Sequence, residues 1–288
     1  MAYATVNGAR IAWQQMGQGP DLIMLHGLAA SRAFWFPMAS ALSETHRVTL
    51  FDLRGHGYSE RKDSGYSCLD LGRDLIGLMD ALDIGGASVV GHSYGGGAAL
   101  EAAVMAPGRV DRLALLDSRV QYLQPQMRLS DLAGLSGFEQ SVLANAGGAA
   151  ALEHETQIGF RFLEEAARQK VANMTGLGND EFVPFGEGAG ALRAASSFLR
   201  LLEETSARSE FAQPGHDADR LAQLSMPVLM LVGERSRCWP SAQALKRLLP
   251  QARLVSVPGA GHFFPVSAAA FTLAALRDFL APAVENVT

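Results

Sequence analysis

The sequence has 288 residues, of which 48% are hydrophobic and 18% are charged, so the chain has enough apolar surface for a sizeable folded core. This length suits one large domain, or one domain that carries an inserted subdomain. A formal net charge of −5 gives no reason to expect nucleic acid or an anionic membrane as a partner. No signal peptide or membrane span is evident, and the two cysteines, Cys68 and Cys238, are too few for a disulfide framework or a zinc site. A cytoplasmic protein is therefore expected.

Short apolar or alternating segments, separated by turns, predict β-strands along most of the chain. Asn7-Gly8 lies between the first two segments and is typical of a two-residue hairpin turn. The remaining segments alternate with helical ones, which predicts an α/β fold whose mostly parallel sheet is covered by helices on both faces. The expected strands comprise residues 3–6, 10–15, 22–25, 47–51, 87–90, 113–116, 228–232 and 253–257.

The helices expected between these strands are recognised by their periodicity and composition. Residues 69–82 carry leucines on one stripe of a helix, and Ser31 is the expected N-cap of a helix over residues 33–42. Further helices are expected at residues 96–106, 241–249 and 268–280.

Strand-like segments vanish between residues 119 and 219. Three Ala-, Leu- and Glu-rich segments there, near residues 130–146, 149–174 and 190–209, predict helices separated by glycine and proline clusters. A hundred helical residues inside an alternating chain indicate an inserted cap. We therefore predict an α/β core made of residues 1–118 and 220–288, with a helical cap at residues 119–219.

Gly91-His92-Ser93-Tyr94-Gly95 fits the G-x-S-x-G pattern between a predicted strand and a predicted helix. A strand that turns into a helix within a few residues needs a strained corner, and Gly91 and Gly95 leave room for it. The hydroxyl of Ser93 would then project from the strand end at the positive end of the helix. Ser93 is therefore the candidate nucleophile.

A serine nucleophile needs a base and a site for the oxyanion. His262 follows the last predicted strand and so lies at the sheet edge where Ser93 stands, which makes it the candidate base. His92 should be packed in the interior because strand alternation turns it away from Ser93, whereas His26 and His56 are expected to hold loops. The backbone amides of Tyr94 and Leu28 are the candidate donors to the oxyanion.

These motifs together resemble the α/β-hydrolase fold family, in the branch that carries a helical cap between the sixth and seventh core strands. The resemblance implies an eight-stranded, mostly parallel sheet, and it implies that Asp52 and Arg54 are scaffold residues. It rests on four motifs in family order: His26-Gly27, Asp52-x-Arg54-Gly55-x-Gly57-x-Ser59, Gly91-x-Ser93-x-Gly95-Gly96 and Gly259-x-Gly261-His262-Phe263.

The acid that orients the histidine departs from the family pattern. Relatives usually carry it shortly after the seventh strand, as Gly-Glu-x-Asp, where this chain has Gly233-Glu234-Arg235-Ser236. Some relatives place the acid at the end of the sixth strand instead, where Asp117 stands. Asp117 is the preferred candidate; Glu234, Asp217, Asp219 or no acid at all are the alternatives.

A serine at the elbow implies acyl chemistry, because dehalogenases and epoxide hydrolases of this fold attack with an aspartate. Hydrolysis of a hydrophobic carboxylic ester, without a metal or cofactor, is the expected reaction. A thioesterase, lactonase, C–C bond hydrolase or acyltransferase would use the same residues, and a non-catalytic ligand-binding homologue is an alternative of another class. A monomer and a homodimer both stay open.

Aromatic residues are the candidate lining of the substrate pocket, although those of the cap could equally form its own core. Phe34, Trp35 and Trp239 lie near strand ends, and Phe138 and Phe160 lie in the predicted cap. The other aromatic residues considered in the cap are Phe162, Phe182, Phe185 and Phe198.

Overall fold

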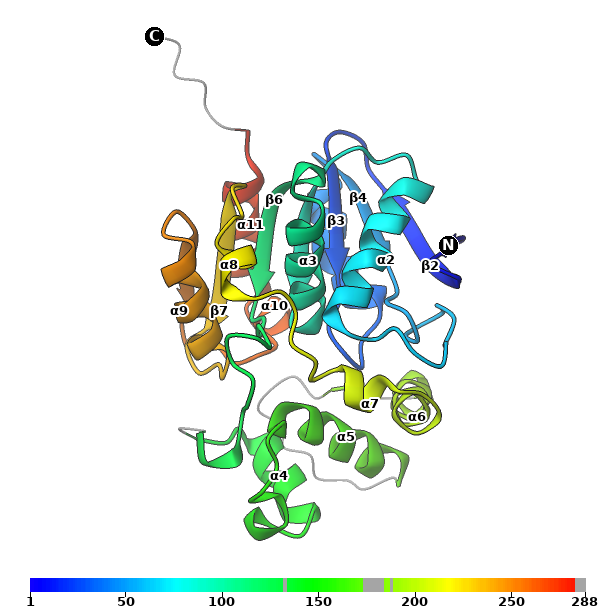
Figure 1. Ribbon diagram of the computed structural model, residues 1–288. Helices are drawn as coiled ribbons and strands as arrows, with labels where there is room; N and C mark the ends of the chain where they lie inside the picture. The colour runs from blue at the N-terminus through cyan, green and yellow to red at the C-terminus, as the bar shows by residue number, and fades with distance from the viewer. Residues whose placement is uncertain (132–133, 173–183, 187–188, 283–288) are drawn as a thin grey trace.

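The computed structural model describes residues 1–131, 134–172, 184–186 and 189–282, and its centre is one mixed sheet (Figure 1). The strands of the described residues follow the spatial order β1-β2-β4-β3-β5-β6-β7-β8. Their number and their places along the chain confirm the fold class expected from the sequence. The strands are β1 (Ala2–Val6), β2 (Ala9–Met16), β3 (Asp21–Leu25), β4 (Arg47–Phe51), β5 (Ala87–His92), β6 (Val110–Leu116), β7 (Val228–Gly233) and β8 (Arg253–Val257).

Only the amino-terminal edge of the sheet is antiparallel. β1 pairs with β2 through the hairpin at Asn7 and Gly8, which adopt φ of 47° and 73°. β2 then pairs antiparallel with β4, and the pairs from β4 to β8 are all parallel. The carboxyl ends of the parallel strands therefore meet at one edge of the sheet, where the loops after β3, β5, β6 and β8 lie.

Two helical layers cover the sheet, and strand residues alternate between them. Ile23 and Leu25 pack with the helices on one face, whereas Leu22 and Met24 pack with those on the other. The first layer contains α2 (Cys68–Ala81), α3 (Tyr94–Met105) and α9 (Trp239–Leu248); the second contains α1 (Phe36–Leu42), α10 (Phe264–Ser267) and α11 (Ala269–Leu280).

The chain between β6 and β7 is largely helical in its described part; most of its helices lie beyond the carboxyl ends of the strands, whereas the last one, α8 (Ala218–Leu221), lies beside α9 at the sheet (Figure 1). Met127, Val142 and Phe162 belong to a separate apolar cluster within it, while Phe198 and Leu201 join the main core. Its helices are α4 (Gly137–Asn145), α5 (Ile158–Val171), α6 (Ala189–Glu204), α7 (Ala207–Glu210) and α8 (Ala218–Leu221). The division into a cap and a core at the stated boundaries stays a prediction.

Some boundaries differ from those expected. Residues 32–35 form a 3₁₀ turn before α1, and the side chain of Ser31 makes no capping hydrogen bond, so the expected Ser31 cap is wrong. α4 begins after Ser136, whose hydroxyl accepts from the amide of Glu139, rather than near residue 130. Among the described residues, no helix has the length and apolarity to cross a membrane.

Candidate active site

Ser93 stands at a sharp corner between β5 and α3. Its backbone adopts φ 55° and ψ −123°, which a non-glycine residue rarely occupies, as expected for a strained elbow. A Cβ on Gly95 would lie 2.3 Å from the carbonyl oxygen of His26, and one on Gly91 would lie 2.5 Å from that of Gly95. Side chains are therefore excluded on both sides of Ser93, and the tight corner depends on these two glycines.

His262 reaches Ser93 from the loop between β8 and α10. Its Nε2 lies 3.0 Å from Ser93 Oγ, and its Nδ1 lies 2.7 Å from Asp117 Oδ2. A carboxylate accepts hydrogen bonds only, so Nδ1 carries the proton and Nε2 is left to accept the hydrogen of the serine hydroxyl. The neutral imidazole is thus oriented as a base toward Ser93.

Asp117 is fully buried at the carboxyl end of β6, where its backbone has φ 49°. The Gly233 amide donates to Oδ1 at 2.9 Å, and the Ser236 hydroxyl donates to Oδ2 at 2.6 Å. Together with His262 Nδ1–H from the loop after β8, three donors hold this carboxylate, two of them from the end of β7 and the loop that follows it.

None of the other candidate acids forms a hydrogen bond or ion pair with His262 in the described part of the chain. Glu234 accepts from the Gly259 amide at 2.6 Å, and Asp217 caps α8 by accepting from the Arg220 amide. Asp219 lies within α8. Of the four carboxylates considered from the sequence, the structure brings Asp117 to His262.

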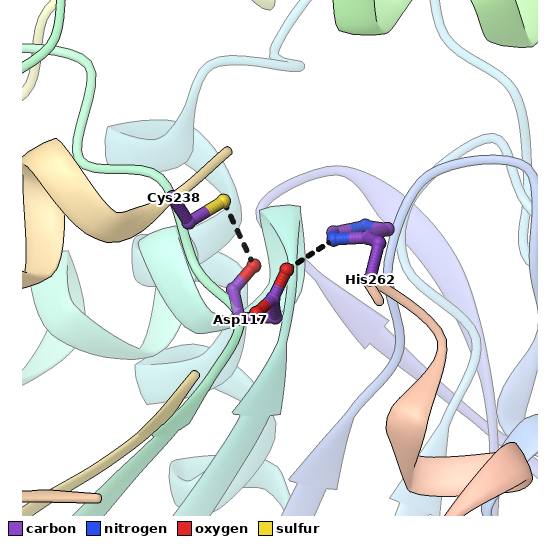
Figure 2. Close-up of side chains that lie close together, drawn as sticks. All are labelled: Asp117, Cys238 and His262. Atoms are coloured by element: carbon purple, nitrogen blue, oxygen red, sulfur yellow. Dashed lines mark hydrogen bonds and ion pairs between the residues drawn. The ribbon is translucent and has the colours of Figure 1, made fainter. Parts of the chain in front are cut away.

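Cys238 is the third potential metal ligand beside Asp117 and His262, and ligand atoms of the three residues lie within 4.8 Å of one another (Figure 2). Its Sγ lies 3.3 Å from the backbone oxygen of Asp117. Burial, and next the negative charge of Asp117, raise the pKa of the Cys238 thiol. The sulfur is therefore a thiol that donates a hydrogen bond, whereas a metal ion would require the thiolate.

The neighbouring histidines are buried and neutral. His92 Nε2 donates to the backbone oxygen of His262 at 2.9 Å, and its ring stacks on Phe34 with centroids 4.8 Å apart. Burial, and next the neighbouring His262, lower the pKa of His92 well below its usual value. His92 is thus packed, as expected, and also supports the loop that carries His262.

His26 and His56 hold loops, as the sequence predicts. His26 Nδ1 donates to the Gly27 carbonyl at 2.7 Å, while its Nε2 accepts from the Leu53 amide at 3.0 Å. His56 Nδ1 donates to the Arg54 carbonyl at 3.0 Å. Burial, and next the neighbouring His26, lower the pKa of His56 to about 4.

The two expected oxyanion donors flank Ser93. Tyr94 is the first residue of α3, where a helix leaves its amides without intrahelical acceptors. A Cβ on Gly27 would lie 3.0 Å from Ser93 Cβ, so the turn that leads to Leu28 packs against the elbow. The amides of Leu28 and Tyr94 have no hydrogen-bond acceptor among the described residues.

A cavity of about 1440 Å³ opens above Ser93 and His262, between the strand-end loops and the helices that follow β6. Of the predicted pocket residues, Phe34, Phe160 and Trp239 line it, and Leu28 and Tyr94 also reach its wall. Phe162, Phe185 and Phe198 line the cavity as well.

The prediction that Trp35 lines the substrate pocket is wrong. Trp35 is 1% exposed and packs in the core with the strands instead of lining the cavity. The reason is local: in the 3₁₀ turn adjacent side chains point about 120° apart, so Phe34 faces His92 while Trp35 faces inward. Phe182 and the side chain of Phe138 lie outside the described residues.

Sequence reasoning missed what Ser236 and Cys238 do. Ser236 Oγ accepts from the Cys238 amide at 3.0 Å, which leaves its hydrogen to bind Asp117. From the sequence, Ser236 appears only as the residue that replaces an aspartate. No local pattern signals this contact, because Asp117 lies 119 positions earlier in the chain.

Residues 20–269 match the family model for the alpha/beta hydrolase fold. The chain belongs to this family. The match covers most of the chain and includes Ser93, Asp117 and His262.

Named relatives in this family are hydrolases. A 2-(acetamidomethylene)succinate hydrolase of Mesorhizobium japonicum is 27% identical over 93% of this chain and 90% of its own length. A pimeloyl-[acyl-carrier protein] methyl ester esterase of Nitrosomonas europaea is 31% identical over 88% of this chain and 93% of its own.

Other similar proteins match only part of their length or share only the fold. This chain spans about a third of the length of uncharacterized mycobacterial proteins, to which it is 34% identical over 118 residues. The solved structure of carboxylesterase CesB from Bacillus subtilis has a TM-score of 0.71 and 18% identity, over 98% of this chain and 92% of that one. At that identity the likeness concerns the fold.

Proposed function

We propose that the protein is a serine hydrolase that cleaves carboxylic esters through an acyl-enzyme formed on Ser93. The observation that carries this proposal is the hydrogen-bonded series from Ser93 Oγ to His262 and on to Asp117, at 3.0 and 2.7 Å. Esterase activity in a relative of 31% identity supports the choice of bond.

Each group has a role in the proposed reaction. His262 Nε2 takes the proton of Ser93 Oγ as the oxygen attacks the ester carbonyl, and then gives it to the leaving alkoxide. Asp117 stabilises the imidazolium and keeps Nδ1 protonated. The free amides of Leu28 and Tyr94 are the donors proposed for the oxyanion.

Deacylation reverses these roles. Water takes the place of the alcohol, His262 accepts its proton, and the resulting tetrahedral intermediate releases the carboxylic acid and returns the proton to Ser93. The large cavity and its aromatic walls support a substrate with a sizeable apolar portion.

A ligand-binding homologue without turnover is less well supported. Such a protein would have no need for an intact series of hydrogen bonds, and the serine at position 236 fails to break that series because Ser236 itself binds Asp117. Replacement of the usual aspartate is therefore compatible with catalysis at this site.

The direct experiment is hydrolysis of p-nitrophenyl esters from acetate to dodecanoate by wild type, Ser93→Ala and Ser196→Ala. Ser196 lines the same cavity on α6 and is the matched control. We expect turnover in wild type and Ser196→Ala and a loss of at least about 10³-fold in Ser93→Ala. Equal turnover in Ser93→Ala would refute the serine mechanism, and no turnover of any ester by wild type would refute esterase activity.

A further inference from the structure

Arg119 is a basic residue of the cavity wall with an incomplete set of partners. It lies two residues beyond Asp117, and its Nε donates to the Gln124 carbonyl at 2.8 Å. Its Nη1 donates to Gln157 Oε1 at 2.7 Å. Its Nη2 is buried and has no acceptor among the described residues.

Both acceptors of Arg119 are neutral, and no carboxylate of the described residues pairs with it. Arg54 and Arg200, in contrast, each pair with a carboxylate. Buried Arg54 pairs with buried Asp74 at 2.7 Å, and Arg200, which also lines the cavity, pairs with Glu204 at 3.0 Å. An arginine always carries its charge, and such a charge is usually paired when it is buried.

Burial lowers the pKa of Arg119, as expected for a partly buried guanidinium without a counter-charge. The hydrogen bonds to Gln124 and Gln157 hold the guanidinium of Arg119 in place before any ligand binds. A planar guanidinium with one free edge is suited to a carboxylate, which accepts two parallel hydrogen bonds.

Arg119 belongs to the same part of the cavity as Ser93. A Cβ on Gly97, in the first turn of α3, would lie 3.7 Å from the Arg119 carbonyl oxygen. The Phe160 ring connects the two sides of this region: its centroid is 5.9 Å from Arg119 Cζ and 6.1 Å from the ring centroid of Tyr94. A ligand at Ser93 can therefore extend along Phe160 toward the guanidinium.

We propose that Arg119 binds a carboxylate of the substrate, so that the preferred substrate is an ester with an apolar middle and a free carboxylate at its far end. This inference rests on the proposed hydrolysis at Ser93. Arg119 sets specificity here, while the bond-breaking steps belong to Ser93 and His262. The aromatic walls take the apolar middle of the substrate.

The test compares mono-p-nitrophenyl esters of adipic, pimelic and suberic acids with neutral p-nitrophenyl esters of the same chain lengths. Wild type, Arg119→Gln, Arg119→Lys and Arg200→Gln are measured with both sets. Arg200 is the matched control because it is a cavity arginine that already has a carboxylate partner.

We expect wild type to have a kcat/KM at least about 10-fold higher for the best anionic ester than for its neutral counterpart. In Arg119→Gln the anionic ester loses about 30-fold, mainly through KM, and the neutral ester changes less than about 3-fold. Arg119→Lys retains part of the preference, and Arg200→Gln retains it within about 3-fold.

Two results would overturn the inference. One is a wild type without preference for the anionic esters. The other is an equal loss of kcat/KM for both sets of esters in Arg119→Gln, which would indicate that Arg119 only holds Gln124 and Gln157. Calorimetric titration with adipate and suberate separates this from failure of the proposed hydrolysis. Where no ester is cleaved, dicarboxylate binding that is lost in Arg119→Gln supports the carboxylate site. Equal or absent binding in both proteins contradicts it.

Discussion

The hydroxyl of Ser236 lies 2.6 Å from Asp117 Oδ2, the oxygen that also accepts from His262 Nδ1. Ser236 occupies the loop after β7, where relatives usually carry the acid itself. The carboxylate that binds His262 therefore belongs to Asp117 at the end of β6, and Ser236, at the usual position of the acid, donates a hydrogen bond to it. This relationship reconciles a sequence that departs from its family with a complete series of hydrogen bonds.

Asp117→Asn should lower kcat for p-nitrophenyl esters by about 10³-fold or more, because the amide presents the wrong donor to His262 Nδ1 and no charge to the imidazolium. KM should change little. Circular dichroism and the thermal midpoint serve as controls for folding. Turnover within about 10-fold of wild type would exclude Asp117 as the acid.

The double variant Asp117→Asn with Ser236→Asp should recover part of that loss. Ser236 Oγ is close enough to Asp117 Oδ2 for a carboxylate at position 236 to approach His262. We expect kcat to rise about 10-fold above that of Asp117→Asn alone. The matched control is Asp117→Asn with Ser236→Ala; recovery there as well would show that a carboxylate at position 236 plays no part.

Gly95→Ala should destabilise the protein by about 3 kcal/mol, because the new Cβ would lie 2.3 Å from a backbone oxygen in the packed elbow. Gly85→Ala is the control, since a Cβ there has nothing within 4 Å and should change stability by less than about 0.5 kcal/mol. Urea unfolding measures both. Equal stability of the two variants would contradict the tight elbow.

The lowered pKa of His56 predicts that the folded protein loses stability in mild acid. This pKa is about 4 in the folded protein against 6.5 as the ordinary value, so between these pH values the unfolded chain binds more protons. Stability should therefore fall as the pH drops through this window, with about 2 kcal/mol lost at about pH 5 from His56 alone. Urea unfolding of wild type and His56→Gln measures this; the same slope against pH in both would contradict the assignment.

The sequence was sufficient for the parts of the fold that local pattern determines. The continuous apolar segment of β3, the hairpin at Asn7-Gly8 and the glycines around Ser93 all lead to the structures expected. It also placed Ser93, His262 and Asp117 at one sheet edge, because parallel strands end on the same side.

Other features depend on side chains that are far apart in the chain. The contact of Ser236 with Asp117 joins residues 119 positions apart, and no local signal encodes it. Trp35 was misplaced because a 3₁₀ turn replaced the first turn of the expected helix. The unpaired edge of Arg119 likewise becomes visible only when its neighbours in space are known.

Covalent labelling by a fluorophosphonate, mapped by mass spectrometry, tests most directly whether Ser93 is a nucleophile activated by His262. We expect wild type to carry one phosphonyl group, on the peptide that contains Ser93. His262→Gln should react at least about 10²-fold more slowly, and Ser93→Ala should not react. A wild type that stays unlabelled, a label on another residue, or labelling at an equal rate without His262 would contradict the serine mechanism.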